Sequence, residues 1–198
     1  MEIKQGGKFR IMKKVMLAAL LFMGSIATVM AQDKPKVEVF GGYSFLHTSD
    51  SGVSLNSNGA SGSVAFNANE WFGVVGDVGY YHGNPDVFGT DVSVNTFSYL
   101  FGPKIAMRHN EKFTPFLQAL FGGARQKTTV NLSGISSSGS ENAFAMALGG
   151  GFDVKVANSV AIRLVQAEYV LTKFTDADDN RQNSVRISTG VVFRFGQH

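Results

Sequence analysis

Hydrophobic and polar residues alternate with a period of two along most of the chain after residue 35. This period is typical of strands that present one face to an apolar environment and the other to a polar one. Eight such runs can be delimited: 36–46, 60–69, 71–82, 94–107, 113–126, 142–155, 159–172 and 183–195. No run shows a helix start signal followed by an apolar heptad. Each run is long enough for a tilted membrane-spanning strand, which needs about 9–11 residues.

The connections between these runs alternate in length. Every second connection is long and polar, and these cover 47–59, 83–93, 127–141 and 173–183. The others are tight and consist of Glu70, 108–112 and Ala157–Asn158. Long loops at one end and short turns at the other are typical of an outer-membrane barrel whose termini are periplasmic. Such a barrel must close, because an open edge would leave backbone groups unpaired in hydrocarbon. The predicted fold is therefore all-β, an eight-stranded antiparallel up-and-down transmembrane β-barrel.

Successive side chains of a strand point to opposite faces. Every second residue of each run is therefore predicted to face the lipid. This face carries almost no charge, as the membrane requires, because a lipid-facing Lys or Arg at the midplane costs about 2–4 kcal/mol. Its aromatic residues gather near the strand ends, which fits two aromatic girdles. It comprises Val37, Val39, Gly41, Tyr43, Phe45, Val64, Phe66, Ala68, Phe72, Val74, Gly76, Val78, Tyr80, Phe97, Tyr99, Phe101, Pro103, Ile105, Leu117, Ala119, Phe121, Phe144, Met146, Leu148, Phe152, Val185, Ile187, Val191, Phe193 and Phe195.

The opposite face is mostly polar and is predicted to line the lumen. It comprises Glu38, Ser44, Ser63, Asn67, Asp77, Thr96, Ser98, Lys104, Gln118, Asp153, Gln166, Glu168, Arg186, Ser188 and Arg194, together with the apolar Phe40, Val75 and Leu100. Its charged members form a predicted lumen charge network of Glu38, Asp77, Lys104, Asp153, Glu168, Arg186 and Arg194. Four acids face three bases there, so the charges nearly cancel.

The topology predicts two ion pairs in this network. The first and last runs must be neighbours, and Glu38 and Arg194 both lie near the periplasmic end. Glu168 faces Arg186 if Leu171 pairs with Asn183. Lys104 and Asp153 are also expected near the periplasmic end, in one cluster with Glu38 and Arg194. Because side chains just fill the interior of an eight-stranded barrel, we expect a plugged lumen.

Two residues do not fit the simple alternation. Arg163 is out of phase with Gln166 and Glu168, so it lies either at the periplasmic interface or beside a β-bulge. Pro103 removes a hydrogen-bond donor from within a strand.

The N-terminal segment has the features of a secretory signal peptide. Met12-Lys13-Lys14 precedes an apolar run of about fifteen residues, which ends in small residues suited to cleavage after Ala31. The expected organisation is a signal peptide over 1–31, with Met12 as the expected true start, and a barrel domain over 32–198. A transmembrane anchor is the alternative, but it needs about 20 apolar residues.

Removing this leader changes the charge. Five of the 18 basic and one of the 15 acidic residues lie in 1–31, which leaves 13 against 14 and a net charge of −1. The composition therefore gives no case for nucleic-acid binding. With no cysteine, the chain can form neither a disulfide framework nor a thiolate metal site.

Catalytic, metal and cofactor sites are not predicted. His47 and His82 lie at the loop ends near Ser49, Asp50 and Ser51, but no fixed spacing supports a Ser–His–acid or Asp–His arrangement. The acidic run 176–180 lacks the glycine and the terminal glutamate of a calcium loop of the EF type. Pairs of glycines such as Gly41-Gly42 lie inside strand patterns without a following helix, so they indicate curvature or close packing rather than a phosphate loop.

The last run carries the most specific resemblance. Ser188, Gly190, Phe193 and Phe195 have the spacing polar-x-Gly-x-x-aromatic-x-aromatic. This resembles the C-terminal signal of the small outer-membrane β-barrel proteins of Gram-negative-type bacteria, the OmpA/OmpX-like barrels. The resemblance covers about the whole mature chain and implies that the barrel-assembly machinery reads these four residues. One departure is that Gly196-Gln197-His198 follow the final aromatic residue.

These observations lead to three functional hypotheses. The first is a non-enzymatic integral protein of the bacterial outer membrane, in contact with outer-membrane lipids, whose extracellular loops contact any ligand. The second is a small porin-like channel, or a conduit for a small or apolar compound. The third is a lipid-modifying enzyme or protease of the outer membrane. Fold alone does not choose among them.

Overall fold

The computed structural model describes residues 35–50, 53–83, 86–87, 90–110, 112–132, 135–174 and 181–196. The predicted signal peptide, Met12, the acidic run 176–180 and His198 lie outside these residues. Within the described part of the chain, no helix is long and apolar enough to cross a membrane.

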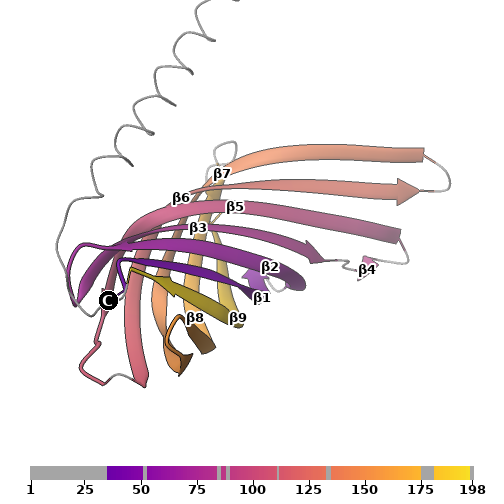
Figure 1. Cartoon of the computed structure of the whole chain (residues 1–198). Helices are drawn as coiled ribbons and strands as arrows, with labels where there is room; N and C mark the ends of the chain where they lie inside the picture. Colours follow the sequence, from indigo (N-terminus) through magenta and orange to yellow (C-terminus); the bar gives the residue numbers. More distant parts are fainter. Residues whose placement is uncertain are drawn as a thin grey trace, which may run out of the picture. The chain divides into compact units, whose positions relative to one another are not determined.

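Most of the described residues form strands, as the period of two predicts (Figure 1). The strands are β1 (Val37–Asp50), β2 (Val53–Asn67), β3 (Phe72–Gly83), β4 (Asp86–Val87), β5 (Thr90–Ala106), β6 (Phe113–Leu132), β7 (Ile135–Ala157), β8 (Val160–Phe174) and β9 (Arg181–Phe195). Eight of them are long, whereas β4 is a two-residue strand that pairs with the start of β5.

The eight long strands close into a barrel. Each pairs antiparallel with its neighbours along the chain, β3 pairs with β5, and β1 pairs with β9. The seam between β1 and β9 sets Glu38 opposite Arg194, and in the last hairpin Leu171 pairs with Asn183, which is the register that the sequence predicted. We call the end where β1 begins and β9 ends the terminal end, and the opposite end the loop end.

The strands at the loop end are longer than predicted. The segment 127–141 was predicted to be a loop, but it forms most of the upper β6–β7 hairpin, which is paired as far as Leu132 and Ile135. Most of 47–59 is likewise strand, and β5 already begins at Thr90. These segments are rich in Ser, Thr, Asn and Gly and contain few apolar residues, so their sequence shows no sustained hydrophobic alternation. Figure 1 shows β5, β6 and β7 reaching past the loop ends of the other strands.

The two predicted faces are confirmed by burial. The charged and polar lumen residues are largely buried, whereas the predicted lipid face contains the most exposed large apolar side chains, such as Phe101, which is 66% exposed. Lumenal Phe40, Val75 and Leu100 are buried as expected. Two apolar clusters fill part of the interior: Ala65, Val75, Leu100, Leu120, Ala124, Ala145 and Ala147, and Phe40, Ala161 and Val192.

A β-bulge in β8 accounts for the phase of Arg163. Between Arg163 and Gln166 the strand contains one residue more than β9, where Gly190 and Ser188 are their partners. Both Leu164 and Val165 are therefore exposed on the outer face, while Arg163 and Gln166 are both buried. Of the two interpretations left open by the sequence, the bulge is correct, and the interface position is wrong.

Two further irregularities have simple causes. The β5–β6 ladder has no paired residues between Phe101 and Lys104, where Pro103 lacks a backbone donor. At the closing seam Gly42 pairs with Gly190, and a Cβ on either glycine would lie within 3 Å of the Phe40 ring. The two glycines are therefore needed for the lumenal ring of Phe40 to lie against the seam.

Candidate functional site: the lumen charge network

Arg186 on β9 is the centre of the part of the network that lies nearer the loop end. Its guanidinium contacts Glu168 on the adjacent strand at 2.6 Å and Asp77 on β3 at 2.7 Å. Its Nη1 also donates to the Tyr81 hydroxyl at 3.1 Å. Because two strands, β1 and β2, separate β9 from β3 in the sheet, the contacts with β3 cross the lumen. Only 1% of the Arg186 surface is exposed.

Two glutamines complete the hydrogen bonding of Glu168. Gln118 on β6 donates to its Oε1 at 2.9 Å, and Gln166 donates to its Oε2 at 2.7 Å. Both carboxylate oxygens of Glu168 are therefore occupied by buried donors. Buried charges are tolerated only when they are paired and hydrogen-bonded in this way.

Glu38 on β1 contacts three cations near the terminal end. Lys104 Nζ lies 2.8 Å from its Oε2, and Arg108 Nη2 lies 3.4 Å from the same oxygen. Arg194 Nε, on the adjacent strand, lies 3.4 Å from Oε1. The strongest contact of Glu38 is therefore with Lys104, on the far side of β2 and β3 in the sheet, rather than with its cross-strand neighbour.

Arg163 and Asp153 form a second buried pair at this level. The guanidinium binds the carboxylate in a two-point contact, with Nε–Oδ1 at 2.8 Å and Nη2–Oδ2 at 3.1 Å. It also donates to Gln166 Oε1 at 2.6 Å. The rings of Phe40 and Phe116 lie 4.4 and 4.3 Å from its central carbon. A planar guanidinium suits this combination of a two-point carboxylate contact and aromatic stacking better than an ammonium does.

The structure thus brings together all seven residues of the predicted lumen charge network. It also adds two cations that the predicted network did not include: Arg163, whose position the sequence left open, and the turn residue Arg108. For Arg163, the signal was the pair of apolar residues Leu164-Val165 between two polar residues, which is the pattern of a bulge. Position along the strand predicted that Lys104 lies at the same end of the barrel as Glu38, but it did not predict their contact, which crosses the lumen.

The four residues of the predicted assembly signal lie on both faces of β9. Phe193 and Phe195 are exposed on the outer face. Ser188 is buried in the lumen, where its hydroxyl lies 2.6 Å from that of Ser44, which also contacts Ser61. Gly190 lies at the closing seam. Recognition of these residues by the barrel-assembly machinery remains an expectation from the sequence.

The histidines at the loop end contact amides. The Nδ1 atoms of His47 and His82 are hydrogen-bonded to the side-chain oxygens of Asn56 and Asn95, at 2.6 and 2.7 Å. Neither bond is to a serine or a carboxylate; Ser51 and the Asp50 side chain lie outside the description. Among the described residues, no group of three or more His, Cys, Asp and Glu side chains is placed to hold a metal ion.

Comparison with known proteins agrees with this geometry. The sequence model of the outer membrane protein beta-barrel domain matches residues 16–195. No curated protein matches the chain. Among solved structures, Ail of Yersinia pestis is similar at 21% identity and a TM-score of 0.60, over 81% of this chain and 99% of that one. Neisserial surface protein A is similar at 17% identity and a TM-score of 0.63, over 83% and 100%.

OprG of Pseudomonas aeruginosa is similar at 11% identity and a TM-score of 0.51, over 85% of this chain and 99% of that one. At these identities the three structures establish the fold alone. The family match covers most of the chain and coincides with a closed barrel that exposes an apolar outer face. The chain therefore belongs to the outer membrane protein β-barrel domain family, and it is an integral protein of the bacterial outer membrane.

Proposed function

We propose that this protein is a surface-interaction protein, and that its binding element is the sheet formed by the loop ends of β5, β6 and β7. We call this element the protruding sheet; it comprises residues 90–95, 126–132 and 135–142. In outer-membrane barrels the short turns are periplasmic, so the loop end is extracellular.

A row of tyrosines marks where the barrel leaves the lipid. On the outer face, the hydroxyls of Tyr80 and Tyr169 donate to Asn95 and Asn183 at 2.9 and 2.8 Å, and Tyr43 donates to Asn58 in the same way. Tyrosine rings with their polar ends held by amides are suited to the membrane–water interface. On β6, Gly123 pairs with the outward-facing Tyr99, and the strand continues to Leu132. The extension spans roughly 30 Å of strand beyond this boundary.

Among the residues that the structure describes, one edge of the protruding sheet has no paired strand. The pairing of β7 with β8 begins only at Ala143 and Phe174, so within the described residues 135–142 pair with β6 alone. This segment contains neither lysine nor proline, which natural proteins often place on edge strands to block further pairing. An open edge can bind an extended peptide as an additional strand. This edge is the observation that carries the proposal.

The outer surface just above the tyrosines is basic. Arg125 and Lys127 on β6 are both exposed, and Arg125 also donates to Ser140 on β7 at 3.4 Å. These cations favour an anionic ligand. Ail of Yersinia pestis, to which this fold is similar, has been solved in complex with the heparin analogue sucrose octasulfate. Heparin is therefore a suitable second probe beside extended peptides.

Shortening the protruding sheet tests the proposal. Replacing 128–139 with Asn-Gly joins the paired residues Lys127 and Ser140 by a two-residue turn. The intact protein in nanodiscs should bind immobilised heparin or members of an extended-peptide library, and the shortened variant should lose this binding. Equal heat-modifiability on gels would show that both barrels are folded. Unchanged binding by the shortened variant, or no binding by the intact protein, would reject the proposal.

The charge network supports a plugged lumen, as expected from the sequence. Arg186 and Lys104 each reach across the interior to a carboxylate on a non-adjacent strand, at 2.7 and 2.8 Å. The purified protein should therefore be silent in a planar bilayer at applied potentials at which porins conduct. Steady single-channel steps would contradict this expectation and favour the conduit hypothesis instead.

A further inference from the structure

The lumenal face of the barrel carries a group of cations at the terminal end. Arg108 and Arg194 contact Glu38 in the lumen, both at 3.4 Å. Lys36 lies two residues before Glu38, so it has the same parity and faces the same side. These residues and two further lysines lie on β1, β5, β6, β7 and β9 or directly adjoin them, so they lie around the opening of the barrel. We call this group the basic rim; it comprises Lys36, Arg108, Lys112, Lys155 and Arg194.

Lys112 and Lys155 are neighbours within the basic rim. The backbone N–H of Lys155 donates to the carbonyl of Lys112 at 2.9 Å, so the two residues are directly opposed. Lys155 also pairs with Ala161, which is fully buried on the lumenal face, so both lysines have the parity of the lumen. Like charges that face each other across two strands are destabilising. Within the described part of the chain neither lysine forms an ion pair, so a bound anion would remove this repulsion.

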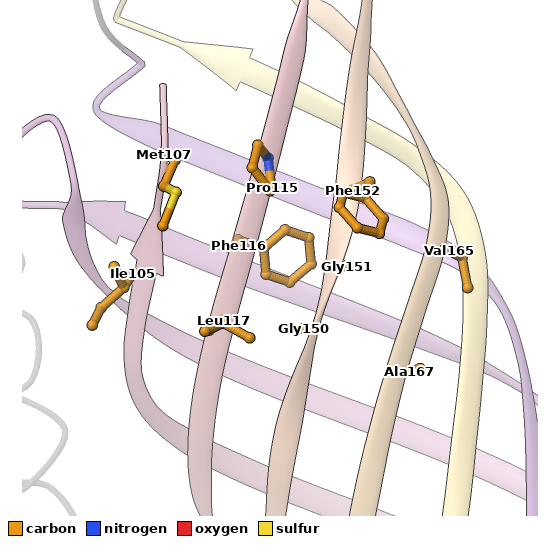
Figure 2. Close-up of a pocket in the computed structure, with 10 residues that line it drawn as sticks. All are labelled: Ile105, Met107, Pro115, Phe116, Leu117, Gly150, Gly151, Phe152, Val165 and Ala167. Carbon is orange, nitrogen blue, oxygen red and sulfur yellow. The ribbon is translucent and has the colours of Figure 1, made fainter. Parts of the chain in front are cut away.

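The outer face of the same strands is apolar. Met107 and Phe152 belong to the apolar side chains that line a hollow in the outer wall across β5 to β8 (Figure 2). Met107 directly precedes Arg108, and the exposed Phe113 directly follows Lys112. The alternation of the strands thus places apolar side chains toward the lipid and the cations of the basic rim toward the water at the mouth of the lumen.

The acids at this end do not balance the cations. Glu38 is one carboxylate shared by three cations, and Asp153 is already bound through both oxygens by Arg163. Among the described residues, the basic rim together with Lys104 and Arg163 just inside it gives seven cations, and three acids face them, which leaves a surplus of four positive charges. The three acids are Glu38, Asp153 and the turn residue Glu70.

Arg194 is not fully hydrogen-bonded, although only 5% of its surface is exposed. Its contacts with Glu38 Oε1 and Thr114 Oγ1 are both long, at 3.4 Å. Among the described residues, its Nε has no hydrogen-bond partner. The contact with Thr114 crosses the lumen from β9 to β6, and it brings the guanidinium toward Lys112, which lies two residues before Thr114. Buried donors normally have a partner, and an anion at the basic rim would supply one.

The surplus of charge favours a multivalent anion. A carboxylate would neutralise one positive charge, whereas a phosphate group carries about −1.5 to −2 near neutral pH and offers three acceptor oxygens. A guanidinium binds phosphate oxygens through parallel N–H donors, and an ammonium binds them as a point charge. The basic rim offers both kinds of donor. Only a small group fits there, because side chains just fill the interior of an eight-stranded barrel.

We propose that the basic rim binds a phosphate-class anion at the periplasmic mouth of the lumen, between Arg194, Lys112 and Lys155. The anion is a water-soluble phosphate or the phosphate group of a soluble ester, because these cations face the lumen and not the surrounding leaflet. The lumen charge network lies directly inside the basic rim, so the anion is held at the mouth. This inference is independent of the proposed extracellular function, because it concerns the opposite end of the barrel.

Calorimetric titration of the folded protein in maltoside micelles with inorganic pyrophosphate tests the proposal. The wild type should bind one pyrophosphate per barrel. Lys112→Gln/Lys155→Gln should weaken this binding by roughly tenfold or more, because charge-assisted hydrogen bonds are lost. Lys173→Gln/Arg181→Gln is the matched control, since these residues are also an exposed cross-strand pair of cations, but at the loop end. It should bind as the wild type does, and heat-modifiability on gels controls for folding in every variant.

Two comparisons identify the anion and its source. Acetate should bind roughly tenfold or more weakly than pyrophosphate, because it carries a single charge, and equal affinities would overturn the phosphate class. The affinity for pyrophosphate should be the same in phosphatidylcholine nanodiscs as in micelles. Loss of binding in nanodiscs would assign the basic rim to a lipid headgroup and overturn the soluble source. Wild-type affinity of the double lysine variant, equal weakening by the loop-end control, or no saturable binding by the wild type would overturn the site itself.

Discussion

Replacing Arg186 with methionine should destabilise the barrel by about 3–5 kcal/mol, because breaking a buried ion pair leaves uncompensated charge in a low-dielectric interior. Arg186 is the ion-pair partner of both Asp77 and Glu168, at 2.7 and 2.6 Å. Glu168 keeps its bonds from two glutamines, but Asp77 loses the cation that its carboxylate contacts. Urea unfolding in phospholipid vesicles, followed by the fluorescence of Trp71, the single tryptophan, measures the change.

Two companion variants make this expectation specific. Arg194→Met should cost only about 1 kcal/mol, the value of an ordinary hydrogen bond, because Glu38 keeps Lys104 at 2.8 Å and Arg108 at 3.4 Å. The triple variant Arg186→Met/Asp77→Asn/Glu168→Gln should recover most of the lost stability, since no unpaired charge remains. Equal losses of stability for Arg186→Met and Arg194→Met would contradict the distances, which make Arg186 the main cation of its carboxylates and Arg194 only one of three around Glu38.

Arg163→Met should be the second strongly destabilising substitution. Asp153 is 0% exposed, and its two oxygens accept hydrogen bonds from the Arg163 guanidinium. Loss of this partner should again cost about 3–5 kcal/mol. The same urea titration in vesicles measures it.

The type of cation at this position should also matter. Arg163→Lys keeps the charge but loses the two-point contact and the planar stacking between Phe40 and Phe116. Its free energy of unfolding should therefore lie between those of the wild type and Arg163→Met. Adding Asp153→Asn to Arg163→Met should restore stability in part. An unchanged urea midpoint for Arg163→Met would show that the buried Arg163–Asp153 pair does not stabilise the barrel.

The parts of the barrel that contact lipid could be predicted from sequence, because there the environment of the two faces differs sharply. Residues such as Phe101 and Lys104 must then take opposite sides, and a period of two follows. Cross-strand neighbours such as Glu168 and Arg186 could also be predicted, since the hairpin and the closure of the barrel define the register.

Other features depend on interactions that a single strand does not encode. The upper β6–β7 hairpin consists mostly of Ser, Thr, Asn and Gly, so the segments around Thr128 and Ser138 show no alternation that would distinguish a strand from a loop. The contact between Lys104 and Glu38 crosses the lumen, and depends on which strands face each other and at which height. Arg163 needed the bulge, which a regular alternation does not include.

The seam between β1 and β9 also has a consequence for folding kinetics. Ser44 and Ser188, which meet there, are 144 residues apart in the chain, whereas the other long strands pair with partners nearby in sequence. Contacts of such long sequence separation carry a large loop-closure entropy and form slowly. Refolding into vesicles should therefore end in a slow step in which the first and last strands join, after the intervening hairpins have formed.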